Sequence, residues 1–339
     1  MIHLTHEYYK MVLFYCNITI LIDINLCYKE ITMSEKVFMD TRLQVRLLKS
    51  RGVIIKNNKW AKQTIRNVNY YNLINGYKEP FLQNGISSDK YLIGTTLEEI
   101  YALYEFDRKL RIVTLEYILE VEKQVKSLIS YSFSKSYGHK DYLRLENFDT
   151  KGIKKFSQTC DLLSNLYRKI HSNIDKDLPI SHYVDNKNYI PLWVLVNSIS
   201  LGDTSKFYSN MLQKERQDVA RRFKWGLREH QLSSSLFFLS TIRNRCAHDE
   251  RLYSYSSYIN LCQNNYFKYF NVNEKNTNNY FAVMVAFKIL LNDKRFSEYI
   301  TQIEALLNEL SSQLSTISLK TIRNIMGVPS NWKKLKTLQ

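Results

Sequence analysis

The chain has 339 residues, of which 45% are hydrophobic and 13% aromatic; this composition excludes an intrinsically disordered protein and leaves room for one or two domains. The 48 Lys and Arg residues against 32 Asp and Glu residues give a formal charge of +16, so polyanions such as nucleic acids are the first candidate partners. A basic composition can also reflect genome composition and general solubility, and that alternative stays open.

Residues 1–32 are expected to be a non-native or disordered N-terminal extension. Their apolar run, Met11 to Ile22, is interrupted by Asn17 and is shorter than the roughly 20 residues that a membrane-spanning helix needs. No small-residue cleavage site follows it, and Met33 opens a stretch typical of an ordinary soluble N-terminus. We therefore expect translation to start at Met33 and no membrane attachment. A strand or helix packed on the body is the alternative.

Most long segments carry apolar residues at helical spacing, and only 4 Pro and 9 Gly residues interrupt them, which predicts an all-α fold. Residues 33–90 are expected to form a small N-terminal helical module. Its first helix is capped by Asp40 and ends near Gly52, and its second runs over about residues 60–71. A turn-rich segment over residues 76–89 follows.

Residues 91–339 are expected to form a larger helical domain. Thr95 and Thr96 precede Glu98 and Glu99 by three residues, a doubled capping-box pattern that predicts a long helix closing near Gly138. Apolar residues three and four apart predict its buried face: Leu110, Val113, Tyr117, Val121, Val125 and Leu128.

The remaining helices follow from caps and apolar spacing. In chain order we expect them over residues 154–171, from Pro191 to before Gly202, from a cap at Asp203 or Thr204, over the charged stretch 214–230, along the apolar stripe Leu236, Leu239, Ile242 and Cys246, and over residues 281–291 and 300–314. A loop containing Pro179 is expected to join the first two, and a basic tail ends the chain.

The stretch from Ile242 to Tyr253 is the most informative part of the sequence. Asn244 and His248 are four residues apart and share a helix face, and Arg243 immediately precedes Asn244 on the same helix. The three side chains can therefore converge near one helix end or across a pair of such helices. If that helix faces a cleft, it holds what is needed to cleave RNA without a metal.

RNA carries its own nucleophile, the 2′-hydroxyl, beside the phosphate that must be broken. His248 suits a general base or acid, because imidazole titrates near neutral pH. Arg243 suits the charge that develops on the phosphorane, and Asn244 could hold the imidazole tautomer or the scissile phosphate. The expected products are a 2′,3′-cyclic phosphate and a 5′-hydroxyl, with no metal or cofactor required.

Each of these residues also has a purely structural interpretation. His248 could be a satisfied helix-end histidine and Arg243 a surface ion-pair partner. Cys246 is expected to be a small core residue, since its place on the apolar stripe would raise its pKa. The five cysteines form no Cys-x-x-Cys pair, and neither they nor the seven histidines have the spacing of metal ligands. We therefore expect reduced thiols, a cytoplasmic location and no zinc site.

The motif stretch, Arg243-Asn244-x-Cys246-Ala247-His248-x-x-Arg251-Leu252-Tyr253, resembles the signature of the Abi-type abortive-infection proteins of bacteria, the AbiD/AbiF-like family. Other segments similar to the family pattern follow in order over residues 33–332: Leu48-x-x-Arg51-Gly52, Asn69-Tyr70-Tyr71-x-Leu73-x-x-Gly76-Tyr77-x-x-Pro80-Phe81, Tyr104-x-Phe106-Asp107-x-x-Leu110-Arg111, Tyr137-Gly138, Pro191-Leu192-Trp193 and Gly327-x-Pro329-x-x-Trp332.

The resemblance implies a HEPN-like helical bundle with Arg243, Asn244 and His248 as its active-site motif. It also implies a homodimer, or a partner that supplies a second motif, because HEPN ribonucleases usually pair two. Glu122 resembles a glutamate of the family's Ile-Glu-x-x-Leu-Arg stretch, although Lys126 replaces the arginine; a structural pairing of Glu122 with a motif cation is the alternative.

Arg245, Arg251 and Tyr253 are candidate supporting residues, and the last two could position RNA or simply close the helix end. The leading hypothesis is an antiphage-defence toxin that acts as a metal-independent endoribonuclease, with RNA as substrate and a noncoding RNA or a protein as candidate antitoxin. A non-catalytic RNA-binding partner or sensor is the runner-up. A membrane-attached effector, based on the apolar N-terminal run, is a third hypothesis.

Overall fold

The computed structural model describes residues 38–83, 89–224 and 226–338, and these residues form an all-α protein. No strand occurs in these ranges, which contain three isolated bridges: Ile54 with Thr96, Leu82 with Tyr91, and Phe148 with Met211. The predicted fold class is therefore confirmed. The N-terminal extension, with its apolar run, and part of the turn-rich segment lie outside the described residues. Within them, no helix is long and apolar enough to cross a membrane.

The α-helices follow one another along the whole described chain, and the short helical turns η1 to η6 lie between some of them or after the last. The α-helices are α3 (Thr41–Ser50), α4 (Asn58–Val68), α5 (Leu97–Tyr137), α6 (Gly152–Asn173), α7 (Leu178–Lys187), α8 (Leu192–Leu195), α9 (Leu201–Asn210), α10 (Gln213–Phe223), α11 (Glu229–Ala247), α12 (Asn265–Tyr269), α13 (Tyr280–Leu290), α14 (Asp293–Gln313) and α15 (Leu319–Ile325). The turns are η1 (Tyr71–Asn75), η2 (Glu79–Phe81), η3 (Leu145–Asn147), η4 (Val196–Ser198), η5 (Glu274–Asn276) and η6 (Trp332–Lys336).

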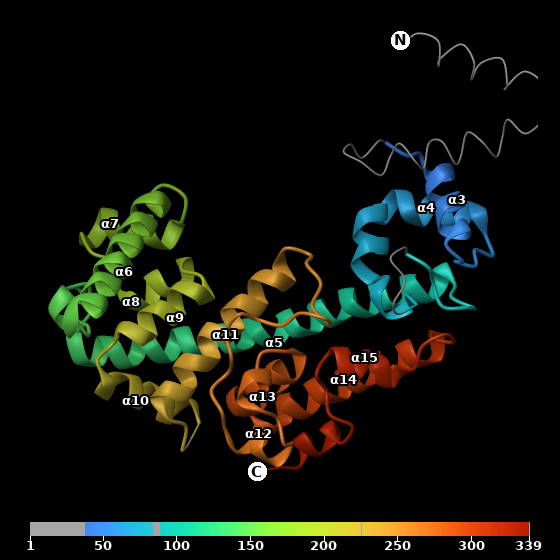
Figure 1. The fold of residues 1–339 in the computed structure, drawn as a ribbon. Coiled ribbons are helices and arrows are strands. Elements are labelled where there is room, and N and C mark those ends of the chain that lie inside the picture. The colour runs from blue at the N-terminus through green and yellow to red at the C-terminus, as the bar shows by residue number, and fades with distance from the viewer. Residues whose placement is uncertain (1–37, 84–88, 225, 339) are drawn as a thin grey trace, which may run out of the picture.

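Helix α5 is the axis of the molecule, 41 residues long (Figure 1). Its start is fixed by a reciprocal capping box between Thr96 and Glu99, and its end by Gly138, whose φ of +77° a residue with a Cβ rarely adopts. Helices α10, α11 and α14 pack along it. The long core helix predicted from the capping pattern is confirmed at both ends.

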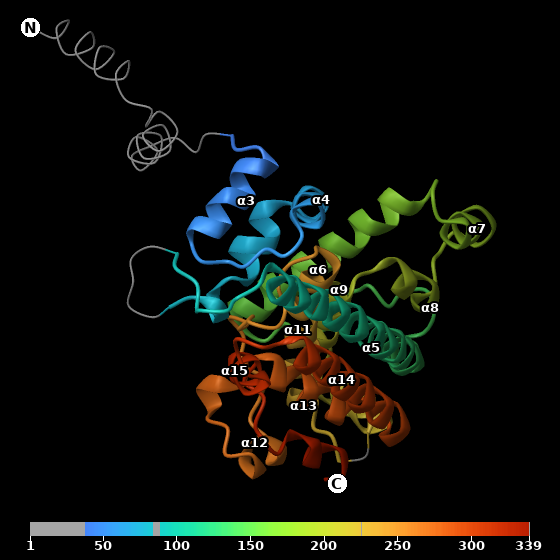
Figure 2. The same ribbon diagram turned by 90° about the vertical axis from the view of Figure 1, so that its right-hand side faces the viewer.

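The two helices of the N-terminal module lie over the start of α5, on the side opposite α13, α14 and α15 (Figures 1 and 2). Asp40 caps α3 by accepting from the N–H groups of Arg42 and Leu43, as predicted, and Asn57 caps α4. Between them, the N–H of Ile54 donates to the carbonyl of Thr95 at 2.8 Å. The buried side chains of the module belong to the same continuous core as those of the larger helical region.

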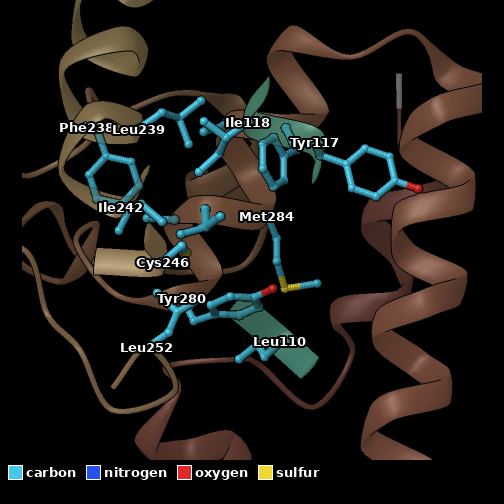
Figure 3. Close-up of a cluster of buried hydrophobic side chains, with 14 of the residues drawn as sticks. Leu110, Tyr117, Ile118, Phe238, Leu239, Ile242, Cys246, Leu252, Tyr280 and Met284 are labelled. Carbon is cyan, nitrogen blue, oxygen red and sulfur yellow. The ribbon is translucent and has the colours of Figure 1, made fainter. Parts of the chain in front are cut away.

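The core beneath α11 is built from three helices far apart in sequence (Figure 3). The stripe predicted for α11 is buried, since Leu236 and Leu239 are 0% exposed and Ile242 is 1% exposed. Facing it are residues of α5, such as Ile118, and of α13, such as Met284. Burial of this stripe turns the opposite face of α11 outward, and that face carries the motif.

Four boundary predictions are wrong. Helix α14 begins at Asp293, seven residues before the expected start at residue 300, because Asn292 caps it there. The expected loop after α6 contains α7, whose first turn holds Pro179 and whose cap is Asp177; proline fits a first turn because its missing N–H has no helical partner there. The cap of α9 is Ser200, with Asp203 as the third helical residue of its capping box. The charged stretch 214–230 is two helices, separated around Gly226 with φ +80°.

Candidate functional site at the end of helix α11

The C-terminal end of α11 is a tight turn that fixes the direction of the chain. The N–H of His248 donates to the carbonyl of Asn244 at 3.0 Å, and the N–H of Glu250 donates to the carbonyl of Arg245 at 3.2 Å. Between them, Asp249 takes a left-handed conformation with φ +56°. The bond from Glu250 to Arg245 is one of the two backbone hydrogen bonds of a Schellman cap, and Asp249 takes the left-handed position where glycine is usual. The turn directs the following residues back toward α5.

The three predicted motif side chains all lie at this helix end. Asn244 and His248 are exposed, one turn apart on the same face, and Arg243 is half-buried beside them. The Nε–H of Arg243 is buried and donates to no hydrogen-bond partner within the described residues. Over the same residues, neither Asn244 nor His248 forms a side-chain hydrogen bond or ion pair. The three groups are therefore free to meet a ligand.

The residues between and after the motif positions are, by contrast, held in place. Arg245 pairs with Glu250 at 2.9 Å and lies over the ring of Tyr255, with its guanidinium carbon 3.7 Å from the ring centre. The Nη1 of Arg251 donates to the carbonyl of Gly76 at 2.8 Å, which ties the helix end to the N-terminal module. The candidate supporting residues Arg245 and Arg251 thus hold the shape of the turn.

Asp107 of α5, fully buried, anchors the chain after the motif. Its carboxylate accepts from the backbone N–H groups of Tyr253 at 2.7 Å and Leu252 at 3.2 Å. It also accepts from the hydroxyl of Tyr77 and from the Nη1 of Arg111, each at 2.8 Å. Burial raises the pKa of this carboxyl, while Arg111 and the backbone donors act in the opposite direction.

Arg111 connects this anchor to the motif turn. Its side chain is 3% exposed, and its Nη2 forms an ion pair with Asp249, which is at the surface. Tyr253, 1% exposed, stacks on Tyr77 with ring centres 5.8 Å apart, so it closes the helix end and its ring is shielded from solvent.

In the sequence, Asp107 and Arg111 stand out only as part of the family resemblance, without a role of their own. A sequence signal was present, because an acid and an arginine four residues apart follow the apolar face of α5. Charged residues on a buried face are rare unless they are paired.

Within the described residues Glu122 forms no hydrogen bond or ion pair with a motif residue. It is 8% exposed and pairs with Lys126 at 2.7 Å. The structural alternative, in which Glu122 pairs with a motif cation, is therefore wrong: its cation is the lysine that replaces the family's arginine.

Cys246 is the small core residue that was expected. Burial raises the pKa of its thiol to about 12, so the thiol is protonated and unreactive at neutral pH.

A cavity of about 730 Å³ opens at the other end of α11, where His230, Arg216 and Lys155 contribute to its lining. His230 and His248 are separated by about 27 Å along the helix. In the part of the chain that the structure describes, no group of three His, Cys, Asp or Glu residues is placed to hold a metal ion.

The fold and the site together define an all-α protein that displays an Arg-Asn-x-x-x-His motif at an exposed and firmly anchored helix end. A family model described as Abi-like protein matches residues 63–254, which include the motif, the anchor on α5 and more than half of the chain. The chain belongs to this Abi-like family of abortive-infection proteins. No curated protein and no solved structure matches the chain.

Proposed function

We propose that this Abi-like protein is a HEPN-type endoribonuclease that cleaves RNA without a metal and acts as a toxin in antiphage defence. The observation that carries the proposal is that one short stretch contains both side chains without a partner and side chains that are held in place. Arg243, Asn244 and His248 have no partner among the described residues, while the residues around them are fixed by hydrogen bonds, ion pairs and stacking. In a stretch with only a structural role, the guanidinium and the imidazole would form hydrogen bonds or ion pairs with other groups of the protein.

The chemistry follows from these three groups and the RNA. His248 takes the proton of the 2′-hydroxyl, and the resulting oxygen attacks the adjacent phosphorus. Arg243 stabilises the added negative charge of the phosphorane with its guanidinium. The bond to the 5′-oxygen breaks, and that oxygen receives a proton, so the products are a 2′,3′-cyclic phosphate and a 5′-hydroxyl. Asn244, one turn from His248, orients the imidazole or the phosphate.

We further propose that the active species is a homodimer, with a second copy of the motif supplying the acid for the leaving oxygen. The motif is exposed at a helix end, which leaves room for a second copy to face it. Beside the anchor, α5 exposes two large apolar residues seven positions apart, Ile112 at 55% and Leu119 at 48%. They share one helix face and form an exposed apolar strip along α5 on which the second copy packs.

The test is to incubate the purified protein with structured and unstructured RNAs in the presence of EDTA and to identify the end groups. Cleavage is expected to leave cyclic phosphate and 5′-hydroxyl ends and to be lost in His248→Ala. His230→Ala is the matched control, because it removes another exposed histidine from the same helix. RNA binding without cleavage by wild type and variant alike, at concentrations where the protein is dimeric, would refute the enzyme and favour a non-catalytic RNA-binding partner or sensor.

A further inference from the structure

The first helix of the N-terminal module presents an unbroken row of cations to solvent. Arg42, Arg46 and Lys49 of α3 stand at positions i, i+4 and i+7, so they share one face, and all three are exposed. The opposite face of the helix is buried through residues such as Val45 and Leu48. We refer to these three cations as the α3 stripe.

The second helix repeats the arrangement. Lys59, Lys62 and Arg66 of α4 stand at positions i, i+3 and i+7; Lys59 and Arg66 are exposed and Lys62 is half-buried. The face toward the core carries Ala61 and Ile65, both buried. Helices α3 and α4 pack against each other, so this α4 stripe and the α3 stripe belong to one two-helix module. We refer to the two stripes together as the basic face.

The basic face does not serve the stability of the helices that carry it. Neither α3 nor α4 contains an acidic residue, so like charges stand three and four residues apart and repel. Arg42 and Lys59 lie in the first turns of their helices, where the helix dipole disfavours a cation. Within the described ranges no carboxylate forms an ion pair with any of the six cations; nearby Asp40 is occupied as the cap of α3. A solvated face that needed only solubility would mix both signs.

The module that carries the basic face is fastened to the motif. Gly76 accepts from Arg251, and Tyr77 donates to Asp107, the anchor of the chain that follows the motif. The module that carries the basic face therefore lies on the same side of α5 as the helix end that carries His248 (Figure 1).

We propose that the basic face binds the sugar-phosphate backbone of RNA and holds it for the motif at the end of α11. This inference rests on the proposed ribonuclease function for its choice of RNA. Unpaired cations in rows match a chain of phosphates, and their mutual repulsion is relieved when a polyanion binds. An anionic membrane is the less suitable partner, because an interfacial helix inserts an apolar face, and the apolar faces of α3 and α4 are turned into the core apart from Leu43, which is 45% exposed.

The experiment measures binding of a fluorescein-labelled single-stranded RNA of about 20 nucleotides by anisotropy over a range of salt concentrations. All proteins carry His248→Ala, so that binding is read whether or not the wild type cleaves RNA. One variant replaces the α3 stripe with Gln and a second replaces the α4 stripe with Gln, which keeps helix propensity while removing charge. The control replaces three exposed lysines across α5 with Gln: Lys268, Lys275 and Lys294.

Each stripe variant is expected to bind the RNA roughly tenfold or more weakly at about 0.15 M salt. The slope of log affinity against log salt should fall by about 2, since each single-strand phosphate contact contributes about 0.7. The control, with the same change in net charge, should stay within about threefold of the parent. Replacing Arg42 and Arg46 with Lys should keep most of the affinity, because backbone contacts need charge more than shape.

Equal weakening in the control would overturn the proposal, because net charge alone would then explain binding. Unchanged RNA affinity in both stripe variants would overturn it too, and if binding to phosphatidylglycerol vesicles were lost instead, the partner would be a membrane. These outcomes are separate from failure of the proposed function, which would appear as the absence of cleavage by the protein with His248 intact. Circular dichroism of each variant checks that the helices remain formed.

Discussion

At the scale of single residues, the candidate site combines two kinds of side chain. Some are fixed by hydrogen bonds and ion pairs, and the three motif side chains have no partner among the described residues. Asp107 is 0% exposed and gathers four donors from three parts of the chain, which fixes where the residues after His248 lie. This anchor acts through position and makes no contact with RNA in the proposed reaction. Its effect on cleavage should therefore be separable from that of the motif residues.

Replacing Asp107 with Asn should lower the free energy of unfolding by about 3 kcal/mol, because it leaves the buried charge of Arg111 without its internal partner. Asp249→Asn is the matched control, since Asp249 pairs with the same arginine but its side chain is 68% exposed. That change should cost less than about 1 kcal/mol. Urea unfolding of the three proteins gives both values. Equal costs for the two substitutions would contradict the assignment of Asp107 as the anchor.

At the scale of helices, caps decide how α5 is placed against its neighbours. Glu99 completes the capping box of α5 and also accepts from the N–H groups of Ser315 and Thr316, each at 2.6 Å, in the turn before α15. One carboxylate therefore holds the start of α5 and the end of the α14 region together. Burial alone raises the pKa of Glu99, but the hydrogen bonds from Thr316 and Ser315 outweigh it and hold the pKa below its ordinary value.

Glu99→Gln should lower the midpoint of thermal unfolding at neutral pH, with a loss of about 1–2 kcal/mol. Because the folded pKa of Glu99 lies below its unfolded value of about 4.5, the stabilisation is complete above that pH and is lost as pH falls through the folded pKa. Calorimetry of both proteins between pH 7 and pH 3 should show their difference shrinking only at the acid end. A difference that is constant over this range would mean that the carboxylate charge is not what stabilises the contact.

Much of the element pattern follows from the sequence because the signals for it are local. The start and end of α5 were predictable from Thr96, Glu99 and Gly138, which act within one helical turn. The break between α10 and α11 was not, since the charged residues on both sides of Gly226 continue a helical pattern across it. The chain turns there at Gly226, whose φ is +80°. The spacing of hydrophobic residues carries no information about this backbone angle.

The same distinction applies to the candidate site. The outward placement of Asn244 and His248 follows from the buried stripe of α11, which spacing alone predicted. The anchor formed by Asp107 joins residues 145 and 146 positions apart, so no local pattern reports it. Tyr253 illustrates the limit, because its sequence position allowed either contact with RNA or closure of the helix end, and its stacking on the distant Tyr77, which favours closure, has no local signal.

At the scale of the whole molecule, the proposed reaction needs two motifs, and each chain carries one. Replacing both Ile112 and Leu119 with Glu should therefore shift the protein from dimer to monomer in analytical ultracentrifugation and lower cleavage by about a hundredfold or more, because charges cannot be buried at an apolar contact. The matched control is the double substitution of Ile93 and Ile153 with Glu, which are 95% and 92% exposed elsewhere. A wild-type monomer with full activity would refute the dimer.

The most direct test of the account compares the cleavage rate and the RNA affinity of wild type, His248→Ala and His230→Ala on one RNA under single-turnover conditions with EDTA. The proposed role of His248 as proton-transfer group predicts a rate loss of about 10²–10⁴-fold in His248→Ala with affinity within about twofold of wild type, and no change in His230→Ala. Cleavage by His248→Ala at the wild-type rate would contradict the proposed role of His248 in proton transfer.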